Sequence, residues 1–168
     1  MATKSDFSPA DWNTLRDTPY LVGFATLMAG SSGVGTIKEL FAISRGMVEN
    51  LTSNIALVRD LSAPAEIEAA RTSLKQSFSG AENKPSPERV RQHAIQSAQS
   101  SMAILSKTAS KEESEAYARM LYGIAEKVAS AAREGGFLGF GGTLVSEGEK
   151  AFLDELRSTL GLEMVKRA

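Results

Sequence analysis

One glycine-rich segment is similar to the phosphate-binding loop of nucleotide-binding proteins. Residues 30–36 contain three glycines and end in Thr36. The phosphate-binding pattern is glycine, four residues, glycine, lysine and then serine or threonine, and its lysine carries the charge that reaches the terminal phosphates. Here Thr36 follows Gly35 directly, and Lys38 comes two residues later, inside an expected helix. We therefore interpret residues 30–36 as a turn between helices and not as a nucleotide site.

The single histidine, His93, lacks the partners that metal binding or catalysis would need. Val90 stands three residues before it, where the di-iron helical bundles carry glutamate. No serine lies in the elbow motif of a nucleophilic hydrolase. The remaining acidic candidates for a carboxylate metal site are Glu39, Glu49, Glu115, Glu126, Glu149 and Glu155. We interpret Glu39 and Glu149 as helix caps, and we predict no catalytic residue, no metal ligand and no cofactor.

A second glycine-rich segment, residues 135–142, carries large apolar side chains. The binding candidates in this segment are Gly135, Gly136, Phe137, Leu138 and Phe140. In one interpretation, the apolar side chains fold back and seal the end of a helical bundle, while glycine permits the tight turns. In the other, an apolar loop grips a protein partner, a ligand or a membrane surface. The first interpretation gives these residues a structural role, and the second gives the same residues a binding role.

Composition excludes several classes of function. A chain of 168 residues with 42% hydrophobic residues is long enough to bury the core of one domain. The net charge of −1 lacks the basic excess of a nucleic-acid-binding protein. The absence of cysteine excludes disulfides, thiolate catalysis and cysteine-ligated metals. The longest mostly apolar run, residues 20–30, is shorter than the roughly 20 residues of a membrane span.

The first residues lack the basic-then-apolar pattern of a secretory signal. We therefore expect a cytoplasmic protein of bacterial type.

Apolar stripes at helical spacing predict an all-α fold, a bundle of about seven helices. Serine or threonine before proline favours helix starts, because the hydroxyl caps free amides and proline suits the first position. Such pairs predict a short helix over 8–16 and a new helix from Thr18-Pro19 to residue 29. Further helices are expected over residues 36–52 with a short continuation at 55–61, then 62–78, 86–107, 110–134 and 146–160.

The segment 21–29 recurs as 121–129, with four of nine positions identical. Each copy runs into a glycine-rich loop and then into a helix start, with Thr36 and Ser146 as the caps. We therefore predict one domain over 1–168, built from two pseudo-repeated helix–loop–helix hairpins. The halves cover about 1–79 and 87–168, and the polar segment 80–86 is the linker between them.

The second hairpin carries a family resemblance. Residues 129–160 contain a helix that ends in small residues, a glycine turn, Val145, a Ser-x-x-Glu cap and an amphipathic helix. This segment resembles the helical hairpin of tellurite-resistance (TerB-like) domains, which are all-helical and duplicated. The family usually has Asp-Gly at the turn, whereas this chain has Glu134-Gly135 and, in the first copy, Ser32-Gly33. The resemblance therefore implies the fold and transfers no metal ligand.

Together these patterns favour a non-enzymatic interaction module that binds a protein partner or an apolar ligand, or that forms a homo-oligomer. The alternative is a carboxylate metal-binding or stress-response protein of the ferritin-like or TerB-like kind. The segment 135–142 motivates the first hypothesis, and the scattered glutamates motivate the second.

Overall fold

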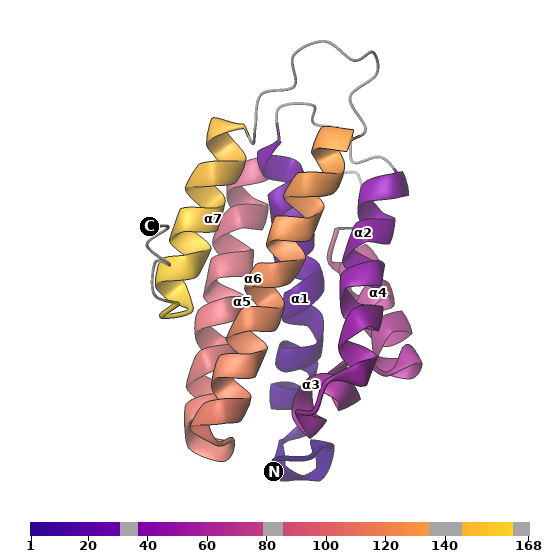
Figure 1. The fold of residues 1–168 in the computed structure, drawn as a ribbon, viewed down its shortest axis with the longest axis vertical. Coiled ribbons are helices and arrows are strands. Elements are labelled where there is room, and N and C mark those ends of the chain that lie inside the picture. Colours follow the sequence, from indigo (N-terminus) through magenta and orange to yellow (C-terminus); the bar gives the residue numbers. More distant parts are fainter. Residues whose placement is uncertain (31–36, 79–85, 135–145, 163–168) are drawn as a thin grey trace.

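The computed structural model describes residues 1–30, 37–78, 86–134 and 146–162, with side chains except at 37–42 and 132–134. The part of the chain that it describes forms an all-α bundle without strands (Figure 1). Its α-helices are α1 (Pro9–Ala29), α2 (Ile37–Val48), α3 (Ala56–Leu61), α4 (Pro64–Ser77), α5 (Pro87–Thr108), α6 (Lys111–Glu134) and α7 (Glu147–Thr159). Two short 3₁₀ helices, η1 (Lys4–Asp6) and η2 (Glu49–Thr52), precede α1 and follow α2.

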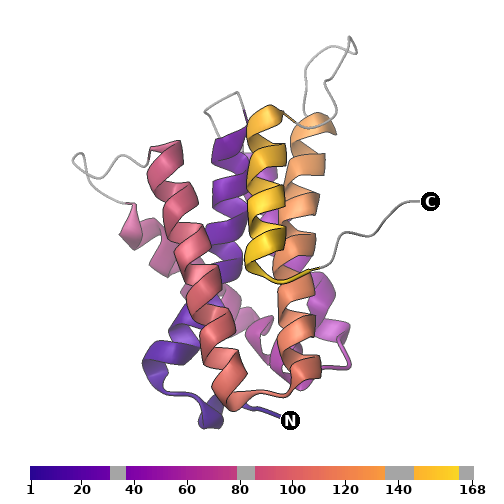
Figure 2. The same ribbon diagram turned by 90° about the vertical axis from the view of Figure 1, so that its left-hand side faces the viewer.

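Helix α1 is the central element of the bundle. It packs most extensively against α5 and then α6, and it also contacts α2, α4 and α7 (Figures 1 and 2). Along its length, α1 contributes buried side chains to the core, among them Trp12, Leu15, Val22, Ala25 and Leu27. The first and second halves of the chain therefore share one core.

The expected break before Pro19 is wrong, because α1 continues from Pro9 to Ala29 with Pro19 inside it. Proline lacks an N–H, so the carbonyl four residues earlier, on Leu15, loses its helical donor. The Tyr117 hydroxyl on α6 donates to that Leu15 oxygen at 2.8 Å and replaces the missing bond. A tertiary contact thus compensates the local defect that the sequence pattern indicates.

The same tyrosine belongs to a small polar network inside the apolar core. The hydroxyls of Thr18 and Ser101 are 3.0 Å apart, and Tyr117 lies 3.2 Å from Ser101. Thr18 also donates to the backbone oxygen of Thr14 at 2.7 Å. All three residues of the network are fully buried, and this burial raises the pKa of Tyr117. The network therefore joins α1, α5 and α6 with neutral hydroxyls.

Serine side chains cap the starts of four of the predicted helices. Ser8, Ser86, Ser110 and Ser146 accept hydrogen bonds from the backbone N–H three residues later. Such caps satisfy amides that have no partner in the first turn of a helix. By contrast, the Ser62 hydroxyl donates to the Val58 carbonyl at 2.8 Å, and Ala63 stands at the start of α4.

The start of α6 is capped reciprocally and also holds the N-terminal segment. The Glu113 carboxylate accepts the amides of Ser110 at 2.9 Å and Ala2 at 2.7 Å. Desolvation alone would raise the pKa of Glu113, but these amide bonds outweigh it and place the pKa below its ordinary value.

The start of α7 is fastened to the end of α1. Ser146 and Glu149 form the predicted capping box, with the Ser146 amide 2.9 Å from the Glu149 carboxylate. Gly148 approaches so closely that a Cβ there would lie 2.5 Å from the Ala29 carbonyl oxygen. The predicted counterpart at Thr36 and the side chain of Glu39 lie outside the described residues.

The two copies of the repeated segment have different surroundings. Gly23 on α1 packs against Ile43, whose Cγ1 would lie 2.5 Å from an added Cβ. Gly123, the matching residue on α6, would have no such neighbour within 4 Å. The internal repeat therefore stays a prediction, whereas the all-α bundle is confirmed.

Candidate functional site

The binding candidates from the sequence, Gly135, Gly136, Phe137, Leu138 and Phe140, lie outside the described residues. Residues 31–36 of the predicted turn and residues 80–85 of the predicted linker do so as well.

His93 lies at an exposed position of α5, beside a depression of about 200 Å³ between α1, α4 and α5. Asp17 and Ser73 line the same depression. The Ser73 hydroxyl donates directly to the Asp17 carboxylate at 2.7 Å, and Arg16 donates to Asp17 at 2.7 Å. A serine nucleophile would have to donate to histidine, whereas Ser73 donates to Asp17. His93, Asp17 and Ser73 therefore do not form a catalytic triad.

Four of the six glutamates considered as metal ligands have other partners. Glu149 caps α7, and Glu155 accepts from Arg91 at 2.6 Å. Glu49 pairs with Lys127, while Glu115 pairs with Arg119. Within the described ranges, no group of three or more His, Cys, Asp or Glu side chains could hold a metal ion.

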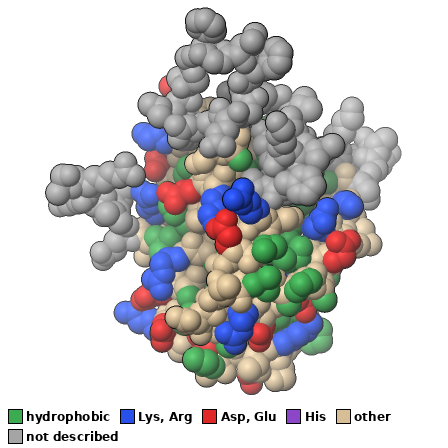
Figure 3. Space-filling view, turned by 45° about the vertical axis from the view of Figure 1, so that its right-hand side comes forward, with side chains coloured by type: hydrophobic (Ala, Val, Ile, Leu, Met, Phe, Trp, Pro, Cys, Tyr) green, Lys and Arg blue, Asp and Glu red, His purple; other side chains and the backbone are tan. Residues whose placement is uncertain are grey.

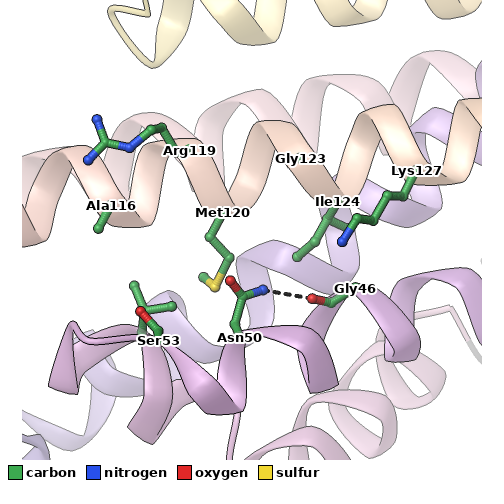
Figure 4. Close-up of a pocket in the computed structure, with 10 residues that line it drawn as sticks. Gly46, Asn50, Ser53, Ala116, Arg119, Met120, Gly123, Ile124 and Lys127 are labelled. Atoms are coloured by element: carbon green, nitrogen blue, oxygen red, sulfur yellow. Dashed lines mark hydrogen bonds between the residues drawn. The ribbon is translucent and has the colours of Figure 1, made fainter.

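A cavity of about 340 Å³ lies between α6 and the segment that runs from α2 through η2 to α3 (Figure 4). This volume falls in the range of small-molecule sites, roughly 300–1,000 Å³. The cavity is lined from one side by Gly46, Asn50, Ser53 and Val58, and from α6 by Ala116, Arg119, Met120, Gly123, Ile124 and Lys127.

Glycine positions explain why the cavity opens where it does. At Gly46 the helices α2 and α6 approach closely, since an added Cβ would lie 3.2 Å from Cγ1 of Ile124. Just beyond this contact α2 ends at Val48, and the chain continues as the 3₁₀ turn η2. On the opposite wall, Gly123 presents no side chain to fill the space. The cavity therefore forms because α2 and α6 are in close contact at Gly46 and the chain then turns away from α6 into η2.

The inner wall of the cavity is apolar. Met120 is 5% exposed, Ile124 is 1% exposed and Val58 is 2% exposed, so all three belong to the core. Figure 4 shows the side chains of Met120 and Ile124 pointing from α6 toward Asn50. The Asn50 amide nitrogen donates to the Gly46 carbonyl at 2.7 Å, which fixes the side chain and leaves its oxygen and its second N–H to interact with a ligand.

One end of the cavity mouth carries a charged cluster around Lys127. The Lys127 ammonium contacts the Glu49 carboxylate, and Arg45 lies 3.8 Å from the same carboxylate. The hydrogen bond from Lys127, with a smaller contribution from Arg45, lowers the pKa of Glu49 below its ordinary value. The Glu49 carboxylate therefore interacts with two cations, Lys127 and Arg45.

The other end of the mouth repeats this arrangement around Arg119. The Arg119 guanidinium lies 3.4 Å from the Glu115 carboxylate, and Lys111 lies 3.8 Å from the same side chain. Arg119 is 59% exposed and Lys127 is 45% exposed, so both cations reach solvent. The face that carries α2 and α6 shows charged side chains of both signs next to a compact group of hydrophobic ones (Figure 3).

The cavity residues were not predicted as a site, although the sequence contains a signal for them. Arg119, Gly123 and Lys127 follow at intervals of four, which places them on one face of a helix. Met120 and Ile124 each follow one of these residues by one position, and both are buried on the inner face of the same helix. The spacing of residues on this helix does not predict the opposite wall of the cavity, because that wall depends on the path of η2.

Comparison with known proteins provides no assignment: no family model, no curated protein and no solved structure matches this chain. The resemblance to tellurite-resistance domains therefore stays a prediction. Among the described helices, none is long and apolar enough to cross a membrane.

Proposed function

We propose that this protein is a non-enzymatic binding module that takes a small, partly apolar ligand into the cavity between α2–η2 and α6. The observation that carries the proposal is the apolar inner wall of Met120, Ile124 and Val58 beside the open surface of Gly123. Ligand sites are typically pre-formed concavities in which a few placed polar groups fix the orientation of the ligand. The Asn50 amide and the charged side chains at the mouth are such groups. The exposed lining of this cavity is more polar than apolar, so the apolar part of a ligand would contact only the inner wall.

The chemistry of the lining favours binding over catalysis. The described residues that line the cavity include no histidine and no acidic side chain. The Ser53 hydroxyl accepts the Ile55 amide at 3.2 Å and has no base beside it in the lining. A nucleophile needs such a base for activation.

The proposal keeps the other expectations from the sequence. A protein partner or a second copy of the chain would use Phe137, Leu138 and Phe140, with Gly135 and Gly136 shaping the loop. A cytoplasmic location and a bacterial origin belong to the same proposal.

Filling the cavity tests the function. Gly123→Leu adds a side chain where a Cβ meets nothing within 4 Å, so the helix remains folded and the ligand loses its space. We expect ligands with a six- to ten-carbon apolar chain to raise the melting temperature of the wild type and not of the variant. Ala103→Leu, at an exposed position of α5, is the matched control and should behave as the wild type. Equal thermal shifts in Gly123→Leu and in the wild type would contradict the proposal.

A further inference from the structure

We infer that the ligand of this cavity is a neutral molecule with an amide group, a primary carboxamide or a lactam, which pairs with the side-chain amide of Asn50 while its apolar part lies against Met120 and Ile124. This inference rests on the proposed function, since it names the chemical class of ligand for the same cavity.

The charges at the cavity mouth balance, so they select neither an anion nor a cation. Among the residues described with side chains, the cations at the mouth are Arg45, Lys111, Arg119 and Lys127. The carboxylates near them are Glu49, Glu112, Glu115 and Glu126. Glu112 and Glu126 stand seven residues before and after Arg119, which places them on its face of α6. The mouth therefore has no excess charge to offer an ionic ligand.

The side-chain amide of Asn50 presents a donor and an acceptor together. Among the described residues this amide has one hydrogen bond, from its nitrogen to the Gly46 carbonyl at 2.7 Å. Figure 4 shows the Gly46 carbonyl on the side of the amide nitrogen that is turned away from the amide oxygen. The second N–H therefore lies on the same edge of the amide as the oxygen, and this edge faces α6.

Such an edge is complementary to another amide. Asparagine uses it to read adenine, which holds an N–H donor beside a ring-nitrogen acceptor. A primary carboxamide and a lactam have the same arrangement, because an N–H and the C=O lie on one side of their C–N bond. A carboxylate has acceptors alone and an ammonium has donors alone, so either ion would leave one of the two Asn50 groups unpaired.

The two walls of the cavity match the two parts of such a ligand. The Ser53 amide donates to the Asn50 carbonyl at 3.0 Å, and the Ser53 hydroxyl accepts the Ile55 amide at 3.2 Å, so the polar wall is held by its own backbone. Met120 and Ile124 face it from α6 (Figure 4). Their apolar surface cannot solvate a charge, but it can cover a hydrocarbon chain or ring. A neutral amide with an apolar part therefore satisfies both walls.

Isothermal titration with four ligands tests the inference: octanamide, its isomer N,N-dimethylhexanamide, octanoate and octylammonium. The isomer has the same atoms as octanamide but no N–H, so it can donate nothing to the Asn50 oxygen. We expect the wild type to bind octanamide at least about tenfold more tightly than each of the other three, because a site built around a hydrogen bond rejects an analogue that lacks it.

A variant of Asn50 assigns this preference to its amide. Asn50→Ser removes the amide edge, while a serine hydroxyl can still donate to the carbonyl four residues earlier. The affinity for octanamide should fall about tenfold, to that for the isomer. Asn54→Ser, at an exposed position outside the lining, is the matched control and should bind all four ligands as the wild type does. Melting temperatures without ligand show that both variants are folded.

The outcomes separate this inference from the proposed function. Equal affinity of the wild type for octanamide and its isomer, tighter binding of either ion, or unchanged octanamide binding in folded Asn50→Ser would overturn the amide class and leave the proposed function standing. The comparison of ligands on the wild type decides this even if Asn50→Ser does not fold. Absence of binding by all four ligands would instead overturn the proposed function, and this inference with it.

Discussion

Tyr117 and Pro19 depend on each other, although they lie on different helices. Pro19 leaves the Leu15 carbonyl without its helical donor, and the Tyr117 hydroxyl supplies one at 2.8 Å. An unsatisfied buried carbonyl costs about 1–3 kcal/mol. The Tyr117 hydroxyl on α6 therefore replaces the backbone N–H donor that α1 lacks at Pro19.

Tyr117→Phe should lower the free energy of unfolding by about 1–3 kcal/mol, because it leaves the Leu15 carbonyl unpaired. In a Pro19→Ala background, the restored N–H can bond to Leu15, so the same substitution should cost less. Urea unfolding of the wild type, both single variants and the double variant measures the coupling. Strictly additive effects of the two substitutions would show that the hydroxyl does not serve the proline defect.

At the scale of the helices, glycine controls how closely neighbours approach. Gly23 lets Ile43 of α2 lie against α1, and Gly148 lets the start of α7 lie against Ala29. Gly123 occupies the matching place in the repeated segment, but it faces the cavity and contacts no second helix there. Glycine thus allows close packing at Gly23 of α1 and leaves open space at Gly123 of α6.

This difference predicts opposite effects for one substitution. Gly23→Ala should destabilise the protein by about 1–3 kcal/mol, since the new Cβ overlaps the buried Ile43 side chain. Gly123→Ala should stabilise it by about 0.5–1 kcal/mol, because alanine favours helix and the added methyl meets open space. Thermal unfolding of the two variants checks both signs. A loss of stability in Gly123→Ala equal to that in Gly23→Ala would mean that the two positions are packed alike.

The sequence predicts most of these elements and misses their mutual contacts. The caps at Ser8, Ser86 and Ser146 are local, so spacing alone locates them. The continuity of α1 escapes such reasoning because the compensating Tyr117 lies 102 residues from Leu15. The cavity escapes it for the same reason, since its walls come from helices that are far apart in the chain. The predicted loop at 135–142 lies outside the described residues and stays a prediction.

For the whole molecule, the position of α1 decides how the two halves depend on each other. The most extensive packing in the bundle joins α1 to α5, across the segment 80–86. The first half cannot bury the core side chains of α1 by itself, because most of the packing partners of α1 lie in the second half. We therefore expect the bundle to unfold as one cooperative unit.

Cutting the chain within 80–86 tests this dependence. Fragments 1–79 and 87–168 should each show reduced helicity and no cooperative unfolding, because each exposes core surface to water. Mixed in equal amounts, they should associate and regain the circular dichroism spectrum and the unfolding transition of the intact protein. Cooperative unfolding of either fragment alone would indicate that the halves are independent.

The central place of α1 also has a consequence during protein synthesis. Helix α1 is complete at Ala29, but its main partners end at Thr108 and Glu134. At about 5–20 residues per second, the ribosome needs roughly 5–20 s to make the chain between these points. During this interval the face of α1 that packs against α5 and α6 lacks those partners, although α2 and α4 are already made. We expect this first helix to be the part of the nascent chain that most needs protection by chaperones.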